Sequence, residues 1–442
     1  MPIRRRLGYL PALVLIFFLC VLLYAFQLHS LISTSRSIDG IEQTADQLDN
    51  YKDEPPNKAQ LKLQNSPLEN EADTADKALL ESPVQDWVKF VRLSDDIFLY
   101  SVILDLRDGN MDYPCVRIVA IVRRRQSITC NFAGNSSVAA SFYELSENHG
   151  LSYGAFVLSC KIPQQIKPET VTSFIVQQDE TKTYVNVQYT VTEKVPPSMP
   201  LTYGICIPVL YGSRYGAANL VEFMELNRII GAGHVFIYLQ HDRLSAEMIK
   251  VVNYYKAKRM LTTLEFKLPV SEQIIWYYGQ LLAIQDCLYR NMGFAKYLAF
   301  QDLDELFVPY SSENIVSMLN PLFSANSSLA SLRIPTRYIK ASEEELAHPP
   351  LAMKLTMAAE AEDVLFTKCV VRPEMVFEQG IHHTSRVIQH HYQTVALPSS
   401  FGQLHHYKNY PSSVSNERVP KTYGKKFLAR YEQVISELQV KS

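Results

Sequence analysis

Residues 297–309 read Tyr-Leu-Ala-Phe-Gln-Asp-Leu-Asp-Glu-Leu-Phe-Val-Pro, and this stretch decides the fold. An apolar strand over 297–300 runs into three acids within four residues, Asp302, Asp304 and Glu305. Side chains two residues apart in an extended chain point to the same side, so Asp302 and Asp304 share a face. Paired carboxylates at the end of a strand suit Mg²⁺ or Mn²⁺. The stretch therefore predicts a divalent-metal site, with a solvated acidic turn as the alternative.

Strands and helices alternate on the way to this turn. Apolar runs predict strands over 204–210, 234–240, 261–268 and 297–300. Helical spacing predicts helices over 217–230, 245–257 and 279–292. This order is typical of an α/β domain with a mostly parallel sheet that helices cover on both faces. We assign it to residues 198–415, and ligands of such sheets bind outside the carboxyl ends of the strands.

The preceding segment, 83–197, has a different pattern. Short β-rich runs separated by turn residues predict strands over 97–106, 116–123, 155–160, 172–177 and 184–191. Val185, Val187 and Tyr189 show the period-two alternation of half-buried strands. Strands at this spacing, without helices, favour a small β-sandwich. The segment contains no catalytic constellation, so we interpret it as a binding or spacing module.

The N-terminus predicts membrane attachment. Three arginines at 4–6 precede an apolar run over 7–28, which is long enough to span a bilayer as a helix. The positive flank holds the tail 1–6 in the cytosol and sends the remainder across the membrane as a single-pass type II protein. A cleaved signal peptide is the alternative. Residues 29–82 are polar and predict a disordered stem, and residues 416–442 form a C-terminal extension with a short helix over 427–440.

Charge and cysteine content limit the functional classes. The chain has 43 Lys and Arg against 45 Asp and Glu, a net charge of −2, which argues against a nucleic-acid partner. One of its seven cysteines, Cys20, lies in the apolar run. The other six are widely spaced without a C-x-x-C motif, which favours disulfides in an oxidising compartment over a zinc site and leaves their connectivity open. Asn135 and Asn326 begin N-glycosylation sequons.

Short motifs occur in a fixed order between residues 200 and 415. They are Ile-Cys-Ile-Pro-Val-Leu-Tyr at 205–211, Leu-Val-Glu-Phe at 220–223, Leu-Asn at 226–227 with Gly231, Gln-Asp-Cys at 285–287, the 300–307 stretch, Lys-Cys-Val-Val-Arg-Pro-Glu at 368–374, Gly-Ile-His at 380–382 and Leu-His-His-Tyr at 404–407. In this order they resemble glycosyltransferase family 92. The resemblance implies a GT-A (Rossmann-like) nucleotide-sugar-binding fold and a metal-dependent inverting transferase that uses UDP-galactose. It also implies Golgi type II proteins that extend N-glycans, including galactose addition to core fucose.

With a sugar nucleotide as donor, the acidic turn gains a role. Asp302 and Asp304 would hold Mn²⁺ or Mg²⁺, and the ion would neutralise the diphosphate leaving group. Asp302 would also contact the donor. His406, in the Leu-His-His-Tyr motif, is the predicted third ligand, and His382 is the second choice, because imidazole is an acceptable ligand of Mn²⁺. Glu305 is expected to support the turn.

An inverting transferase also needs a carboxylate base on the attacking side. Glu378, between the Arg-Pro-Glu and Gly-Ile-His motifs, is the first candidate, and Glu374 and Asp242 are its rivals. Three further predictions concern the donor: Tyr211 stacks on uracil, Asp286 faces the ribose or the sugar, and Arg290 or Lys296 pairs with phosphate.

Two functions from different classes follow. The first is a galactosyltransferase of the Golgi membrane, with a lumenal catalytic domain that acts on protein-linked glycans. The second is a catalytically silent lumenal protein of the same fold that binds glycans or serves as a scaffold. A metal hydrolase is less favoured because the sequence lacks a two-metal pattern of carboxylates or histidines.

Overall fold

The computed structural model describes residues 89–107, 113–192, 198–210 and 215–440. The predicted cytosolic tail at 1–6, the anchor at 7–28, the stem at 29–82 and Tyr211 lie outside these ranges. Across the described part of the chain, no helix combines the length and the apolar character that a bilayer span requires.

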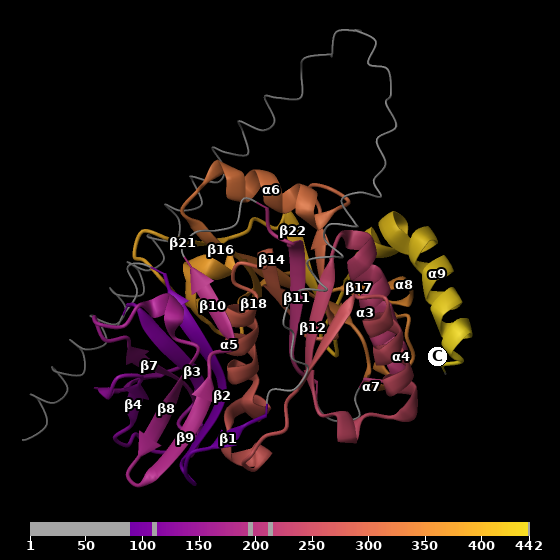
Figure 1. Ribbon diagram of the computed structural model, residues 1–442. Helices are drawn as coiled ribbons and strands as arrows, with labels where there is room; N and C mark the ends of the chain where they lie inside the picture. Colours follow the sequence, from indigo (N-terminus) through magenta and orange to yellow (C-terminus); the bar gives the residue numbers. More distant parts are fainter. Residues whose placement is uncertain (1–88, 108–112, 193–197, 211–214, 441–442) are drawn as a thin grey trace, which may run out of the picture. The chain divides into compact units, whose positions relative to one another are not determined.

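Four parallel strands form one half of the largest sheet (Figure 1). They are hydrogen-bonded in the order β13 (Leu261–Glu265), β12 (His234–Leu239), β11 (Leu201–Leu210) and β14 (Ala295–Phe300). All four were predicted, and their mixed α/β setting is confirmed. The spatial order is third, second, first, fourth, so the direction of the connections reverses between β11 and β14. Ligands of such sheets bind at this reversal, outside the carboxyl ends of the strands.

The other half of this sheet is mixed. Its main strands are β18 (Asp363–Val371), which pairs antiparallel with β14, and β16 (Leu329–Lys340), which pairs antiparallel with β18. The antiparallel pair β15 (Glu305–Pro309) and β22 (Gly402–Lys408) joins it, with β22 parallel to β16. The sheet also includes β17 (Met357–Ala358), β21 (Gln393–Ala396) and β23 (Val414–Ser415), whereas β19 (Val376–Gln379) and β20 (Thr384–Val387) form a separate hairpin. The prediction of a mostly parallel sheet was therefore wrong for this half, because its pairing depends on residues far apart in the chain.

Helices lie on both sides of the parallel strands (Figure 1). Helices α3 (Ala217–Ile230) and α4 (Ala246–Ala257) lie on one side, and α5 (Gln280–Arg290) on the other. The C-terminal helix α9 (Arg418–Leu438) packs on α3, where Arg430 Nε lies 2.6 Å from Glu225 Oε2. This helix begins earlier than the predicted 427–440. The remaining helices are α6 (Ile315–Ala325), α7 (Glu343–Leu346), α8 (Leu351–Lys354) and the short 3-10 turns η1 (Pro168–Thr170), η2 (His241–Arg243), η3 (Glu272–Ile274), η4 (Trp276–Gly279) and η5 (Pro373–Met375).

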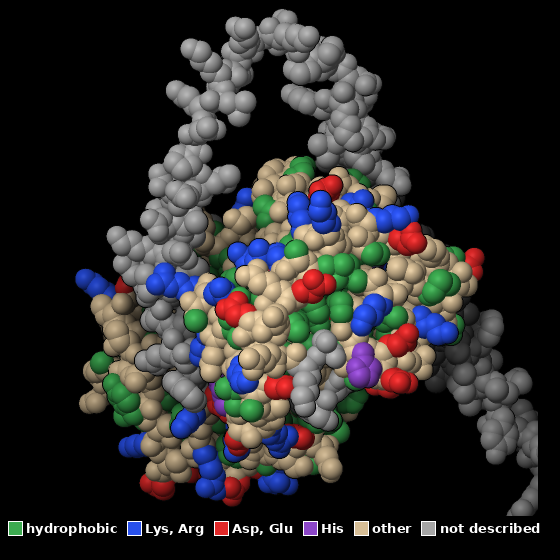
Figure 2. Space-filling view, turned by 90° about the vertical axis from the view of Figure 1, so that its right-hand side faces the viewer, with side chains coloured by type: hydrophobic (Ala, Val, Ile, Leu, Met, Phe, Trp, Pro, Cys, Tyr) green, Lys and Arg blue, Asp and Glu red, His purple; other side chains and the backbone are tan. Residues whose placement is uncertain are grey.

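One face of the molecule shows how the charges are distributed. Figure 2 views the structure from the right-hand side of Figure 1, and on this face acidic and basic side chains are interspersed among polar and apolar ones. No large patch of a single sign gathers among the described residues visible there. This distribution agrees with the near-zero net charge.

Two sheets build the N-terminal part of the described chain. The first contains β1 (Val91–Arg92), β2 (Ile97–Leu106), β3 (Cys115–Val122), β7 (Gly154–Lys161) and β6 (Ser141–Glu144), with β10 (Tyr189–Thr192) parallel to β2. The second contains β5 (Ser136–Ala139), β4 (Thr129–Phe132), β8 (Ser173–Gln178) and β9 (Thr181–Asn186). A shared apolar core and the disulfide Cys130–Cys160 join the two sheets. This is a β-sandwich, in which the predicted strand over 184–191 is divided between β9 and β10.

The first sheet of the sandwich is buried on both faces. In β3, Val116 and Ile118 belong to the core between the two sheets, while Val119 and Ile121 belong to a second core that contains α5. Every residue of α5 is buried. Strand β3 is therefore buried along its whole length, because its second face packs on a helix that comes much later in the chain.

A buried ion cluster lies at this junction. Asp105 Oδ1 lies 3.0 Å from Arg107 Nε, and Asp105 Oδ2 lies 2.8 Å from Arg117 Nε. Arg107 Nη1 also donates to the carbonyl oxygen of Val376 at 2.8 Å, so the cluster links the sandwich to the β19 hairpin. Burial alone would raise the pKa of Asp105, but the two guanidinium groups lower it to about 2. The carboxylate is therefore charged at all ordinary pH values.

We expect Asp105→Ala to lower the free energy of unfolding by about 3–5 kcal/mol, because it leaves two buried guanidinium groups without their carboxylate. Urea unfolding measures this loss, and Asp242→Ala, at an exposed pair with Lys267, is the control that should leave the midpoint unchanged. The folded-state pKa lies below the ordinary 3.8, so the stabilisation is present above about pH 4 and is lost as the pH falls through about 2. An unchanged urea midpoint for Asp105→Ala would contradict the importance of the cluster.

Candidate active site at the end of β14

The acidic turn lies between β14 and β15, at the point where the strand order reverses. Glu305 ties the turn together, because the backbone N–H of Asp302 donates to Glu305 Oε2 at 2.8 Å. The side chain of Asp302 is 39% exposed, whereas those of Asp304 and Glu305 are 5% and 3% exposed. Asp302 can therefore contact a ligand directly, and the buried Glu305 stabilises the turn through its hydrogen bond to the backbone of Asp302.

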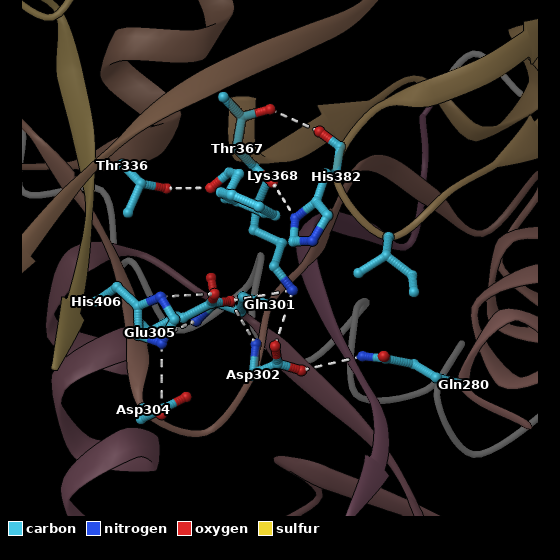
Figure 3. Close-up of polar contacts among 12 residues, drawn as sticks. Gln280, Gln301, Asp302, Asp304, Glu305, Thr336, Thr367, Lys368, His382 and His406 are labelled. Atoms are coloured by element: carbon cyan, nitrogen blue, oxygen red, sulfur yellow. Dashed lines mark hydrogen bonds and ion pairs between the residues drawn. The ribbon is translucent and has the colours of Figure 1, made fainter. Parts of the chain in front are cut away.

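A buried ammonium group neutralises part of this charge. Lys368, on β18, has a side chain that is 3% exposed, and its Nζ lies 2.8 Å from Asp302 Oδ2 and 3.4 Å from Glu305 Oε2. Figure 3 shows this amine beside Asp302 and Glu305, which it reaches from β18, the strand paired with β14. Burial alone would lower the pKa of Lys368, but the two carboxylates raise it above its ordinary value. Lys368 therefore stays charged and fixes the orientation of Asp302.

His406 lies between the other two carboxylates of the turn (Figure 3). Its Nε2 lies 3.5 Å from Asp304 Oδ2, and its Nδ1 lies 3.5 Å from Glu305 Oε1. Strand pairing produces this arrangement, since Glu305 and His406 are direct partners of β15 and β22. Burial alone would lower the pKa of His406, whereas Asp304 and Glu305 raise it. Glu305 thus lies beside one ring nitrogen of His406, and Asp304 lies beside the other.

This donor set fits a divalent ion. Ligands of Mg²⁺ lie at about 2.0–2.1 Å from the metal, so two ligands at a right angle lie roughly 3 Å apart, close to the separation of Asp304 and His406. A carboxylate behind a ligating histidine, here Glu305, is the usual arrangement that orients the ring. The described residues contain no group of three His, Cys, Asp or Glu side chains positioned together as ligands. An ion bound here would complete its shell with water and substrate oxygens.

A pocket opens beside Asp304. Its volume is about 370 Å³, including the part open to solvent, and it lies between α3, the acidic turn and α8. Its walls include Phe223 from α3 and Tyr407, the neighbour of His406, and Glu305 also contributes. Asp304 and Glu305 therefore both line this pocket.

The second metal-ligand candidate has different partners. His382 Nδ1 lies 3.2 Å from the carbonyl oxygen of Thr367, and Figure 3 shows the ring on the Lys368 side of the turn. Burial, followed by the charge of Lys368, lowers the pKa of His382 to about 4. Of the two histidines, His406 is the one that faces Asp304.

Glu378 does not have the surroundings of a catalytic base. Its side chain is fully buried and accepts three hydrogen bonds from the sandwich: from Tyr143 Oη at 2.6 Å, from the Ser146 N–H at 2.6 Å and from Ser146 Oγ at 3.0 Å. An acceptor hydroxyl cannot reach a carboxylate enclosed in this way. We therefore correct the prediction: Glu378 connects the β19 hairpin to the sandwich.

The rival bases are also placed away from the turn. Glu374 is largely buried in η5, and burial raises its pKa. Asp242 is exposed and lies 2.7 Å from Lys267. No contact found among the described residues connects either carboxylate with Asp302 or Asp304.

Asp286 was predicted to face the donor, but it lies inside the molecule. It is 1% exposed and accepts hydrogen bonds from Tyr238 Oη at 2.5 Å and from Arg290 Nη2 at 2.9 Å. Burial raises its pKa to about 6. We correct the predictions for Asp286 and Arg290, because the two side chains pair with one another inside the core. Lys296, the other predicted phosphate ligand, donates to Asn320 Oδ1 at 2.9 Å.

Two residues at the turn were missed from the sequence. Gln280, the first residue of α5, donates from Nε2 to Asp302 Oδ1 at 3.3 Å. Lys368 was noted only as part of a motif. The available signal was a lysine directly before the apolar run Cys-Val-Val, where a buried charge requires an acidic partner.

Comparisons with known proteins found a matching family model and a relative. A model of glycosyltransferase family 92 matches residues 202–441, which extends past the predicted limit of 415 and includes α9. A protein of Caenorhabditis elegans named beta-1,4-galactosyltransferase galt-1 is 36% identical over 365 residues, covering 81% of this chain and 85% of the relative.

Among solved structures, Staphylococcus aureus TarS 1-349 is similar at a much lower level. Its complex with UDP shares 12% identity at a TM-score of 0.30, covering 53% of this chain and 65% of TarS 1-349, just under two thirds. Its complex with UDP-GlcNAc shares 11% identity at a TM-score of 0.28, covering 54% and 72% of the two chains. TM-scores of this size are too low to support a functional argument.

Lys368→Met should lower the free energy of unfolding by about 3–5 kcal/mol, because Glu305 loses its buried cation. Denaturant unfolding of the purified chain gives this value. Lys296→Met is the matched control, since Lys296 is exposed, and we expect a change within about 0.5 kcal/mol. Equal midpoints for the two variants would show that the ammonium does not hold the turn.

Proposed function

Because this chain belongs to glycosyltransferase family 92, we propose that it transfers galactose from UDP-galactose to a protein-linked glycan, with inversion at the sugar carbon. The observation that carries the proposal is the pairing of Asp304 with His406, 3.5 Å apart, beside the ligand-accessible Asp302. The name of the relative from Caenorhabditis elegans supports galactose as the transferred sugar.

The sheet order supports a GT-A assignment for this part of the chain. The acidic turn follows β14 at the reversal of strand order, where a nucleotide sugar would bind. The pocket beside Asp304 has a lining of aromatic, aliphatic and acidic side chains. We propose that the nucleotide part of the donor enters from this side.

Asp302, Asp304 and His406 would hold Mn²⁺ or Mg²⁺, and Asp302 would also contact the donor. The ion supplies positive charge for the diphosphate leaving group. Glu305 fixes the ring of His406, so the imidazole keeps its orientation before the donor arrives. Lys368 holds Asp302 and offsets part of the negative charge that would otherwise repel a diphosphate. The turn is therefore preorganised by its own side chains.

The predicted location supports a glycan acceptor. The disulfides Cys130–Cys160 and Cys206–Cys287 are typical of an oxidising compartment, and the N-terminal apolar run would anchor the chain in the Golgi membrane. Protein-linked N-glycans, including those with core fucose, are the acceptors we propose for a lumenal enzyme.

A glycan-binding protein without turnover is the second candidate. The observation that favours it is the burial of Glu378, which removes the first candidate for the base. The two candidates differ in one measurable product, because only a transferase releases UDP.

The decisive experiment measures UDP release by the purified full-length chain with UDP-galactose, Mn²⁺ and a core-fucosylated N-glycan. We expect chelation to abolish release, and Asp304→Ala or His406→Ala to reduce it about 100-fold or more. Asp242→Ala is the matched control and should behave as wild type. Equal release by wild type and Asp304→Ala would refute the enzyme proposal, and replacing UDP-galactose by other UDP-sugars tests the donor.

Glu378→Gln provides a separate prediction. A general base contributes about 10²–10⁴-fold to the rate, whereas a residue that only connects two parts of the fold contributes to stability. We expect the variant to keep kcat within about threefold of wild type at a temperature below its unfolding transition, and to unfold at a lower denaturant concentration. A loss of kcat above 100-fold in a folded variant would restore Glu378 as the base.

A further inference from the structure

A strained backbone segment lies directly before α5, the helix whose first residue contacts the acidic turn. In η4, Tyr277 and Tyr278 have φ of 44° and 57°, and Gly279 has φ of 75°. Bulky residues rarely adopt this left-handed conformation, and strain of this kind gathers at ligand-binding sites. A Cβ at Gly279 would also make a tight contact, 3.0 Å from Leu268 Cδ2. The chain thus maintains an unfavourable conformation immediately before α5.

The next residue contributes an unused hydrogen-bonding group. Gln280 is 6% exposed, and its Nε2 donates to Asp302 Oδ1 at 3.3 Å. Its Oε1 is buried and has no partner among the described residues. A buried carbonyl oxygen without a donor is costly, so a ligand that supplies a hydroxyl would bind favourably here.

Two aromatic residues, Trp276 and Tyr277, precede Gln280 in the chain. Tyr277 is 50% exposed, and its ring centroid lies 5.1 Å from that of Trp276, which is partly buried. His149, from the loop between β6 and β7 of the sandwich, packs on Trp276 with ring centroids 3.9 Å apart. The same loop also contacts the segment through the N–H of Tyr153, which donates to the carbonyl oxygen of Ile274 at 3.0 Å. The sandwich therefore supports the segment that carries Trp276 and Tyr277.

The two sides of the turn differ in chemistry. Asp304, His406 and the pocket lie on one side, while Gln280 approaches Asp302 from the other (Figure 3). In an inverting transfer, the attacking hydroxyl and the leaving diphosphate are on opposite sides of the sugar carbon. The face of a sugar ring that carries C–H groups packs well on aromatic rings, and its hydroxyls can donate to an amide oxygen.

We propose that Trp276 and Tyr277, called here the aromatic shelf, bind the acceptor saccharide, and that Gln280 Oε1 accepts a hydrogen bond from one of its hydroxyls. The inference rests on the proposed function, in that it assigns the acceptor side of the same site. It also gives the sandwich a role in substrate binding, through the support of Trp276 by His149.

Tryptophan fluorescence tests this directly. The chain has two tryptophans, so Trp87→Phe in the full-length protein leaves Trp276 as the sole reporter. We titrate this protein with a core-fucosylated N-glycan and with its unfucosylated counterpart, without donor or metal. A saturable change in emission with either glycan supports the shelf, and the absence of a change with both overturns it.

Two variants in the same background make the test specific. We expect Tyr277→Ala to weaken glycan binding about tenfold or more, and Gln280→Ala to raise the KM for the acceptor while the KM for UDP-galactose stays within about twofold. Tyr184→Ala, at a 65% exposed tyrosine on β9, is the control that should change neither value. Unchanged glycan binding in Tyr277→Ala would overturn the proposal.

The outcomes separate this inference from the proposed function. If the glycan changes the fluorescence but no UDP is released, the proposal of the aromatic shelf stands and the proposed transferase function is refuted. If UDP is released but neither Tyr277→Ala nor Gln280→Ala changes the acceptor KM, the proposed function stands and the aromatic shelf is refuted.

Discussion

The burial of α5 between two sheets is the constraint on which the rest of the structure depends. All 11 residues of this helix are buried, with the sandwich on one side and the parallel strands on the other. The disulfide Cys206–Cys287 joins the helix to β11, and Gln285 donates to the carbonyl oxygen of Phe377 at 2.7 Å. Because the helix is fixed along its length, its first residue, Gln280, has a defined position beside Asp302.

Two of the buried ion clusters have a similar arrangement. In each, a buried carboxylate is paired with a cation from another strand: Asp105 with Arg117 as well as the nearby Arg107, and Glu305 with Lys368. An unpaired buried charge is costly, so each cluster makes its surroundings depend on distant residues being in place. In the second cluster this dependence serves the site, because the amine that stabilises Glu305 also orients Asp302.

The candidate site was partly visible in the sequence. The apolar strand ending in Asp302 and Asp304 is a local pattern, and His406 followed from a motif that the family resemblance supplied. The incorrect assignments, Glu378, Asp286 and Arg290, share one cause. Their residue types suit catalysis or phosphate binding, but a single sequence does not show that the sandwich and α5 enclose them. Gln280 was missed because its relation to Asp302 exists only after α5 packs.

Periodicity and residue type act over short distances along the chain, so the sequence alone was enough to predict the parallel strands, helices α3 to α5 and the acidic turn. Tertiary structure decided the mixed half of the sheet, the contact of Lys368 with Asp302, and the attachment of the sandwich to α5. These features join residues far apart in the sequence, for example Lys368 and Asp302, which are 66 positions apart. Their energies come from burial and pairing in space, which leave no periodic pattern in either segment alone.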